Sequence, residues 1–165
     1  MTEVALRLKI RDARDEDAEQ LINLIERCYS EYPGCVLDVD SEASELREIA
    51  TYHAKHSGRF WVAESAGQLM ACAGLVQSAA PSVIEMKKVY VTKEARQVGL
   101  GARLCSLVEA EAMSRGATAI ELWSDTRFQD AHRLYEKRGY VRGPKTRELH
   151  DKSNSVEYYF RKDLG

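Results

Sequence analysis

One segment of the chain, VYVTKEARQVGLGARLCSLVEAE at residues 89–111, decides the fold. It begins with residues that favour a β-strand and continues with leucine and valine at the spacing of one helix face. Gly99 and Gly101 stand between the two halves, a short distance after Arg96. Glycine lets the backbone turn sharply and lets a ligand come close to it. A strand, a glycine turn and the start of a helix therefore predict a site for an anion.

Two familiar phosphate-binding motifs do not fit this turn. A dinucleotide fingerprint requires a small residue three positions after Gly101, where the chain has Leu104. A P-loop requires Gly-Lys-Ser/Thr, which the segment lacks. What remains is Arg-x-x-Gly-x-Gly at the start of a helix. Taken alone, this pattern is also typical of a plain turn that caps a helix.

Length and composition set broad limits on the function. A chain of 165 residues with 44% apolar residues fits a single domain, residues 1–165, with a sizeable core. The net charge of −2 argues against a general nucleic-acid binder. The net charge is −5 over residues 1–60 and +4 over residues 126–165. This asymmetry indicates either solvated helix faces or a basic region beside a phosphate-bearing ligand.

No targeting or membrane segment is visible, because residues 1–11 alternate charged and apolar side chains and no apolar run reaches the roughly 18 residues that span a bilayer. The cysteines form no C-x-x-C pair and the histidines have no metal-ligand spacing. We therefore expect a reduced, cytoplasmic protein without a metal site. The residues concerned are Cys28, Cys35, Cys72, Cys105, His53, His56, His132 and His150.

The periodicity along the chain predicts the order β-α-α-β-β-β-α-β-α-β-β. Strands in runs with helices inserted favour a mixed α/β domain. The second helix is expected to begin with Asp40 or Ser41 as its cap. Strands are predicted at residues 5–13, 59–65, 68–76, 82–91, 118–124, 140–149 and 155–164, and helices at 14–29, 40–54, 101–115 and 125–139.

A longer pattern is more specific than the glycine turn. VYVTKEARQVGLGARL is followed by a strand that contains IELWS and then by AHRLYEKRGY. In this order the segments resemble the GNAT superfamily of acyl-CoA-dependent N-acyltransferases, and RLKIRDARDEDAEQL and the closing hairpin also look like that family. The resemblance implies a central, mostly antiparallel sheet of about seven strands, flanked by helices and splayed at the fourth strand.

The resemblance also implies a cosubstrate, acetyl-CoA. Backbone amides of residues 97–102 would hold its pyrophosphate, and strand residues 89–91 would pair with its pantetheine arm, next to a bulge near residues 88–90. Arg133, Lys137 and Arg138 are either contacts to the 3′-phosphate or a solvated helix face. The implied cofactor-binding residues are Val89, Tyr90, Val91, Arg96, Gln97, Val98, Gly99, Leu100, Gly101, Ala102, Ser124 and Ala131.

Acetyl transfer to an amine requires a base, a stabilised thioester oxygen and a donor for the leaving sulfur. The family places a tyrosine beside the sulfur, which implies Tyr135 as the donor. Glu85 is the leading base candidate, and a backbone N–H near Val89 would stabilise the oxygen. Other candidates for the base are Tyr29, Glu31, Tyr32 and Asp125, and a chain of water molecules is an alternative to a side-chain base. A covalent route through Cys105 is a further alternative, although a cysteine in this position is more typical of core packing.

One residue departs from the family pattern. Family members often carry asparagine three residues before the alanine that matches Ala131, and this chain has Phe128 there. The polar contact to the coenzyme arm would then be lost or made by Ser124 or Asp125.

The acceptor is expected against the first helices and the last hairpin. Tyr29, Tyr32 and Glu85 suit a cationic amine, while Arg147 and the basic residues after it suit a carboxylate. Together they indicate the primary amine of a small, amine-bearing or zwitterionic metabolite. From the net charge and the lack of a long apolar run we expect no nucleic-acid or membrane partner, and a homodimer is possible. Transfer to a protein N-terminus or lysine, an acyl-CoA sensor without turnover and a plain interaction domain are the alternatives.

Overall fold

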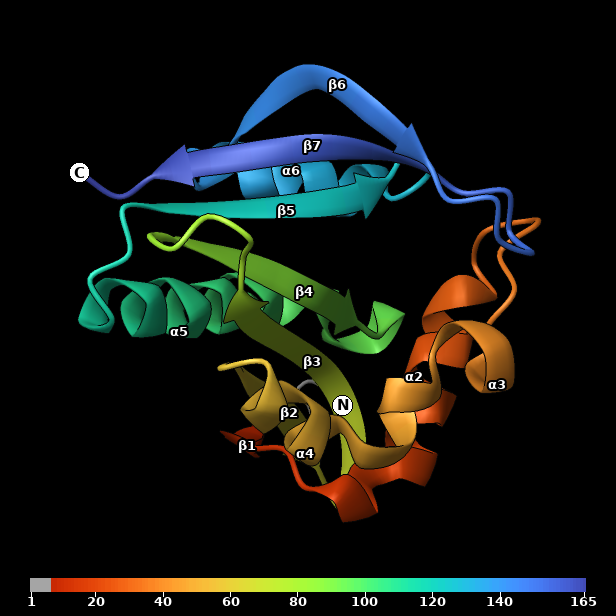
Figure 1. Cartoon of the computed structure of the whole chain (residues 1–165). Coiled ribbons are helices and arrows are strands. Elements are labelled where there is room, and N and C mark those ends of the chain that lie inside the picture. The colour runs from red at the N-terminus through yellow and green to blue at the C-terminus, as the bar shows by residue number, and fades with distance from the viewer. Residues whose placement is uncertain (1–6) are drawn as a thin grey trace.

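The computed structural model describes residues 7–165, which form a seven-stranded sheet in the order β1-β2-β3-β4-β5-β7-β6 (Figure 1). All neighbouring strands run antiparallel except β4 and β5. The predicted fold class is confirmed. Part of the first predicted strand, including Leu6, lies outside the described residues. The strands are β1 (Lys9–Asp12), β2 (Arg59–Ser65), β3 (Gln68–Gln77), β4 (Val83–Val91), β5 (Ala119–Asp125), β6 (Val141–Glu148) and β7 (Val156–Asp163).

Helices cover the two faces of the sheet unequally. On one face α5 and α6 enclose a core with β3, β4, β5 and β7, and on the other face α2 and α4 enclose a second core with β2 and β3. Figure 1 shows α6 behind β5 and β7, with no helix in front of them. The helices are α2 (Ala18–Tyr29), α3 (Val39–Glu42), α4 (Ile49–Lys55), α5 (Leu100–Ser114) and α6 (Gln129–Lys137), with short 3-10 turns η1 (Asp15–Asp17), η2 (Ser44–Glu48) and η3 (Lys93–Val98).

The sheet splays between β4 and β5, as the family resemblance implied. Their parallel pairing ends at Glu85 opposite Glu121, so the rest of β4 has no strand partner on this side. The register of β4 against β3 shifts between Cys72 and Gly74, and Lys88 has φ of +55°. A non-glycine residue with positive φ at a register shift identifies a bulge. The bulge expected near residues 88–90 is confirmed.

The single helix predicted over residues 40–54 is wrong, because the structure divides it into α3, η2 and α4. Its cap is Asp38, whose carboxylate accepts a hydrogen bond from the Ser41 amide at 3.3 Å, and not Asp40 or Ser41. Farther along, the Asp15 carboxylate accepts from the amides of Ala50 and Thr51 at 2.9 and 3.0 Å and caps α4. A contact from a distant part of the chain thus starts a new helix, which local periodicity does not reveal.

The helix predicted at residues 125–139 begins later than expected, at Gln129. The Asp125 carboxylate accepts from the Arg127 amide at 2.9 Å, and the Asp125 carbonyl accepts from the Phe128 amide at 3.1 Å. This side-chain-capped turn competes with helix formation. Gly116, with φ of +76°, ends α5 as predicted.

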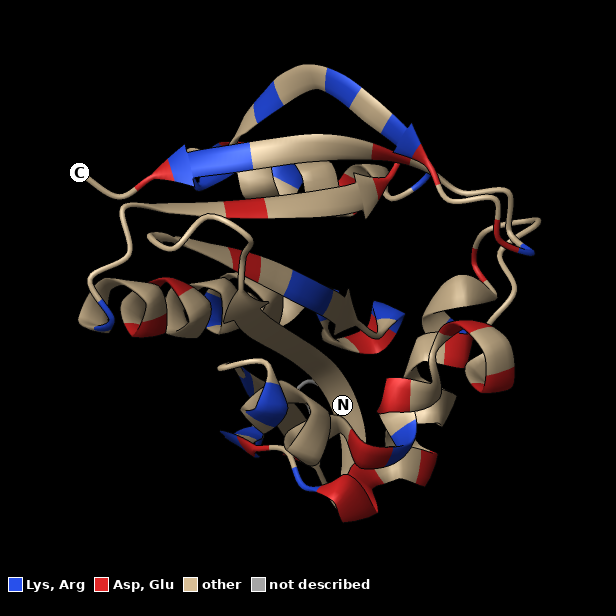
Figure 2. Ribbon diagram, viewed as in Figure 1, with Lys and Arg blue, Asp and Glu red and all other residues tan. Residues whose placement is uncertain are grey.

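Charge is distributed as the sequence indicated. Figure 2 shows acidic residues on η1, α2 and α3 and basic residues along β6 and β7. Among residues 7–165, no helix has the length and apolar character needed to cross a bilayer. The same residues contain no group of three or more acidic, histidine or cysteine side chains that could hold a metal ion.

Candidate active site

A cavity of about 540 Å³ lies at the carboxyl end of β4, where the sheet splays. The start of α5, one face of α6 and the end of α2 form its walls. Residues that the sequence singled out and the structure brings together here are Tyr32, Val89, Tyr90, Val91, Arg96, Gln97, Gly99, Gly101, Ala102 and Ala131. Phe128, the residue that departs from the family pattern, lines the cavity too. Lys93 and Leu134, which lie within the quoted segments but were given no role, and Cys28 and Asp130 complete the lining.

The first turn of α5 presents backbone donors to this cavity. Gly99 precedes the helix with φ of +72°, in the left-handed region that glycine adopts most easily. Its carbonyl accepts the first helical hydrogen bond, from the Arg103 amide at 3.1 Å. The N–H groups of residues 100–102 therefore have no acceptor within the helix, and the helix dipole adds a partial positive charge there. This end of α5 is suited to bind a phosphate group.

Gly101 has a second reason to lack a side chain. A Cβ built on it would lie 3.1 Å from Leu134 Cδ2 and 3.6 Å from Val91 Cγ2. The glycine therefore allows α5 to approach α6 and β4 closely.

Arg96 lines the cavity, but its guanidinium is already bonded. Both terminal nitrogens donate to the Glu31 carboxylate at 2.6 Å, and Nε donates to the Val91 carbonyl at 3.1 Å. These hydrogen bonds to Glu31 raise the pKa of Arg96. The guanidinium thus ties the end of α2 to the end of β4, and the backbone of α5 remains the principal donor for an anion.

Three of the predicted cofactor-binding residues do not line the cavity with their side chains, although for Val98 and Leu100 the prediction concerned the backbone amides. Leu100 is fully buried and Val98 packs against the same core. Ser124 is also buried, within 3.1 Å of His132 Nε2. The Asp125 carboxylate is bound by Arg127 at 2.9 and 2.8 Å. Ser124 and Asp125, the candidates to replace the missing asparagine, thus already have partners within the protein, and neither lines the cavity.

Phe128 fills the place of that asparagine and belongs to an aromatic cluster. Its ring centroid lies 4.9 Å from that of Tyr32, 6.2 Å from that of Tyr29 and 6.3 Å from that of Tyr90. The hydroxyls of Tyr29 and Tyr90 lie 3.2 Å apart. Burial raises the pKa of Tyr29. The cluster joins α2, β4 and the turn before α6 across the open end of the splay.

Tyr135 is buried in the core beside the cavity and is not one of its lining residues. It follows Leu134 and Ala131, which do line the cavity, on the same helix. Its ring lies 5.7 Å from Phe160 and 5.9 Å from Tyr140, centroid to centroid. Burial raises the pKa of Tyr135 well above its usual range, so the phenol stays neutral.

Glu85 lies outside the cavity, where β4 and β5 begin to separate. It pairs with Glu121 in the ladder, while its neighbours Ile84 and Met86 are buried in the core on the α5 side. Because successive side chains of a strand alternate between faces, Glu85 points to the opposite face. The proposed base and the proposed proton donor therefore lie on opposite faces of the sheet.

A sheet of this order, splayed at its parallel pair beside a helix start, is the architecture that the resemblance to the GNAT superfamily of acyltransferases implied. The chain belongs to the acetyltransferase (GNAT) family, whose profile matches residues 18–140. Over 105 residues, 63% of this chain and 68% of the relative, it is 30% identical to an IAA acetyltransferase of Azospirillum brasilense.

Solved structures share this fold. A GNAT-family acetyltransferase of Staphylococcus aureus Mu50 superposes with a TM-score of 0.82, at 19% identity over 96% of this chain and 99% of its own. An acetyltransferase of Salmonella typhimurium, solved with its cofactor acetyl-CoA, superposes with a TM-score of 0.73, at 16% identity over 96% of this chain and 94% of its own.

Proposed function

We propose that this acetyltransferase, as one domain of residues 1–165, transfers the acetyl group of acetyl-CoA to the primary amine of a small metabolite. The transfer proceeds by direct attack while both substrates are bound. The observation that carries the proposal is the cavity at the end of β4, because free helix amides and an unpaired strand edge meet there.

The residues present fit acetyl-CoA, which supplies an acetyl group activated as a thioester. The amides at residues 99–102 bind the diphosphate, with the α5 dipole adding attraction. The edge of β4 beyond Glu85 offers main-chain groups that bond an extended amide-bearing arm. Leu134 and Ala131 supply an apolar wall along that arm.

The chain's residues support each step of the transfer. An alkyl amine has a pKa of about 10, so Glu85 accepts its proton, directly or through water. A backbone N–H near Val89 donates to the thioester oxygen as negative charge develops there. The neutral Tyr135 donates a hydrogen bond to the departing sulfur. Holding the amine beside the thioester accounts for much of the rate.

Contacts between two loops favour a small acceptor over a protein. Ser153, between β6 and β7, accepts from the Val36 amide at 2.8 Å and donates to the Val36 carbonyl at 3.1 Å. Nearby, the Lys152 amide donates to Glu42 at 2.9 Å, and the Lys152 ammonium pairs with Asp38. This loop bridge, residues 30–42 joined to 149–155, lies beside the end of the sheet where β4 and β5 diverge (Figure 1).

The proposal is tested by incubating the protein with acetyl-CoA and a panel of small amines and by measuring thiol release and acetylated product. We expect product that contains one added acetyl group per amine and one released thiol per acetyl group. Binding of acetyl-CoA by calorimetry without turnover on any amine would favour the sensor function. No binding at all would contradict the proposal.

A further inference from the structure

One face of the sheet, formed by β5, β6 and β7, carries an uncovered group of aromatic and charged side chains. Trp123 and Tyr159 are direct partners on this face, with ring centroids 5.1 Å apart. The Lys145 ammonium lies 4.0 Å from the Tyr159 ring centroid. We call this the open face: Glu85, Glu121, Trp123, Lys145, Arg147, Glu157, Tyr159 and Arg161. It faces the viewer in Figure 1, opposite α6.

Arg147 is held in a fixed orientation on the open face. Its guanidinium carbon lies 4.3 Å from the Trp123 ring centroid, and its Nε donates to Glu157 Oε1 at 2.7 Å. Among the described residues, its two terminal nitrogens have no hydrogen-bond partner. The side chain is 43% exposed, so these donors are open to a ligand. A stacked guanidinium with a free edge is well suited to bind a carboxylate through two parallel hydrogen bonds.

The carboxylates of the open face differ in how far they are already bound. Glu121 accepts from the Tyr159 hydroxyl at 2.8 Å and from the Ser78 hydroxyl. Glu157 accepts from Arg147 Nε. Within residues 7–165, no protein group donates a hydrogen bond to Glu85. The open face therefore offers the free edge of Arg147 to an anion and the free carboxylate of Glu85 to a cation.

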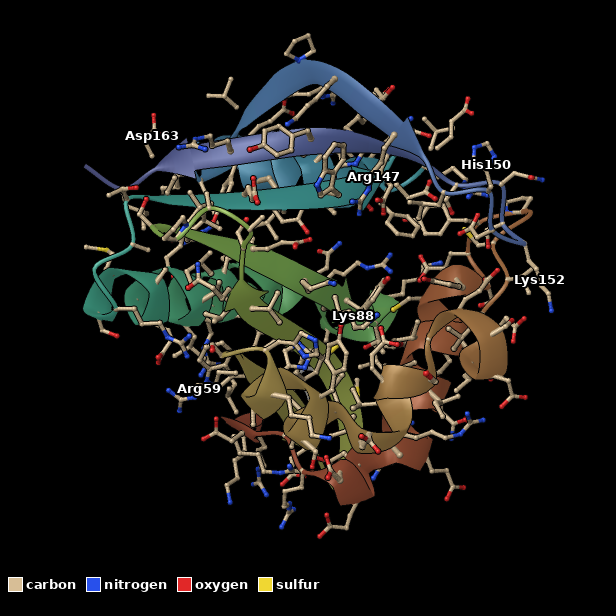
Figure 3. The ribbon with its side chains drawn as sticks, viewed as in Figure 1. Arg59, Lys88, Arg147, His150, Lys152 and Asp163 are labelled. Carbon is tan, nitrogen blue, oxygen red and sulfur yellow. The ribbon has the colours of Figure 1, made fainter. Side chains whose placement is uncertain are left out.

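Both groups lie at the proposed site of transfer. Glu85 is the last β4 residue paired with β5, opposite Glu121, and Trp123 lies two residues farther along β5. Neighbouring strands are about 4.8 Å apart, so the guanidinium above Trp123 is close to the gap where β4 diverges. Figure 3 shows Arg147 in front of β5 and Lys88, on the bulge of β4, below it.

We infer that the acceptor carries a carboxylate together with its amine, and that Arg147 binds this carboxylate. The inference rests on the proposed function, because it names the acceptor class of the same reaction. Arg147 holds the carboxylate over Trp123 while the amine extends toward Glu85 and the splay. An amine without a carboxylate leaves the edge of Arg147 unused and binds more weakly.

The test compares acceptors that differ only in the anionic group. Amino acids, their amides and the corresponding decarboxylated amines are assayed with acetyl-CoA by thiol release. We expect a kcat/KM about 10- to 100-fold higher for the carboxylated members, as hydrogen bonds to a charged group provide. In Arg147→Gln this preference disappears through a higher KM for the carboxylated acceptors, while the rates for uncharged amines change little.

Arg142→Gln is the matched control. Arg142 lies on the same strand as Arg147, but its guanidinium carbon lies 4.0 Å from the Tyr158 ring centroid on the α6 side of the sheet, so its loss removes a similar stacked charge from the opposite face. We expect Arg142→Gln to keep the preference, and Trp123→Leu to weaken it because the Arg147 guanidinium loses its support. Thermal unfolding and acetyl-CoA titration of each variant check that fold and cofactor binding persist.

The outcomes separate the two proposals. If the amides and decarboxylated amines react as well as the carboxylated acceptors, or if Arg147→Gln retains the preference, the inference about the acceptor is wrong and the acetyltransferase function stands. If no amine reacts although acetyl-CoA binds, the proposed function is wrong and the inference falls with it.

Discussion

At the scale of single residues, the burial of Tyr135 determines the protonation state of its hydroxyl and so the role that the hydroxyl has in the proposed reaction. Within residues 7–165 its hydroxyl has no hydrogen-bond partner, and burial holds its pKa well above the usual value of about 10. With its pKa raised, the phenol is neutral and keeps its proton at neutral pH, so it is able to donate a hydrogen bond to a developing thiolate. In the proposed mechanism its role is to stabilise the leaving sulfur.

Tyr135→Phe should lower kcat by about 100-fold and leave acetyl-CoA affinity nearly unchanged. Steady-state kinetics and calorimetry measure the two effects. Tyr140→Phe is the control: its buried hydroxyl donates to Glu109 at 3.1 Å, so that variant should lose stability and keep its kcat. Equal kcat in Tyr135→Phe and the parent protein would remove Tyr135 from the reaction.

His53 gives the folded state a pH dependence. Its Nδ1 lies 2.9 Å from the Ile49 carbonyl, and its Nε2 is buried without a partner among the described residues. Burial lowers the pKa of His53 to about 4 and outweighs the hydrogen bond to the Ile49 carbonyl, which raises it; the positive charges of Lys88 and Lys87 lower it further. The ring is therefore neutral in the folded protein.

Between pH 6.5 and 4 the unfolded chain binds a proton at this histidine that the folded chain does not. The contribution of the neutral His53 to the free energy of unfolding is therefore fully present above pH 6.5 and is lost as the pH falls toward 4. At pH 5 the loss amounts to about 2 kcal/mol. Urea unfolding at pH 7 and pH 5 should show this difference in the free energy of unfolding, and the difference should be smaller in His53→Leu. His56→Leu, at the exposed end of the same helix, should retain it; a similar pH effect in both variants would contradict the account.

Two residues show where sequence reasoning about the site reached its limit. Arg96 belongs to the motif and does line the cavity, yet its guanidinium is bound to Glu31, which lies far away in sequence. Phe128 was recognised as a departure, but its aromatic neighbours come from two other elements. A motif gives the residue type and its place on an element, whereas the partner of a side chain depends on tertiary contacts.

At the scale of elements, the close approach of α5 and α6 depends on Gly101. Gly101→Val would place side-chain carbons against Leu134 Cδ2, at 3.1 Å from the Cβ alone, and would push α6 away from the cavity. We expect a loss of about 1–3 kcal/mol in stability and weaker acetyl-CoA binding, measured by unfolding and calorimetry. Ala110→Val, on the exposed side of α5, should change both by little. Unchanged acetyl-CoA affinity in Gly101→Val would show that this contact does not shape the site.

The two helices are also joined by a buried charge cluster. Glu109 on α5 accepts from Arg138 at 2.6 and 3.1 Å and from the Tyr140 hydroxyl at 3.1 Å, and Lys162 lies 3.6 Å away. Burial opposes the charge of Glu109, but its partners outweigh it and lower the pKa.

Glu109→Ala should lower the free energy of unfolding by about 2–3 kcal/mol, because it leaves the Arg138 guanidinium and the Tyr140 hydroxyl without their acceptor. Denaturant titration measures the loss. Asp40→Ala removes a highly exposed partner of Arg47 and should cost less than about 1 kcal/mol. If the two variants lost the same stability, the cluster would have no special role in joining α5 to α6.

The elements themselves were largely predictable, because each buries one face against the sheet and so repeats apolar residues at its own period. The pairing of β4 with β5 over only three residues, and the cap that Asp15 provides to α4, were beyond local reasoning. The splay was expected only through the family resemblance. Periodicity predicts that a strand is present, but it does not predict the residue at which the neighbouring strand diverges from it.

At the scale of the whole molecule, the strand order β5-β7-β6 creates the open face. It brings Arg147 over Trp123 although they lie on strands separated by a helix in the sequence. The sequence indicated a basic hairpin suited to a carboxylate, but the stacking and the free guanidinium edge depend on this order. The loop bridge is likewise a contact between two loops distant in sequence.

The central claim is that acetyl-CoA binds at the splay, with its diphosphate on the amides that begin α5. The most direct measurement is a crystal structure of the full chain with acetyl-CoA. The account predicts the diphosphate at residues 99–102, the arm along the free edge of β4 and the thioester sulfur near the Tyr135 hydroxyl. Acetyl-CoA bound elsewhere, or a cavity closed by the protein's own side chains, would contradict it.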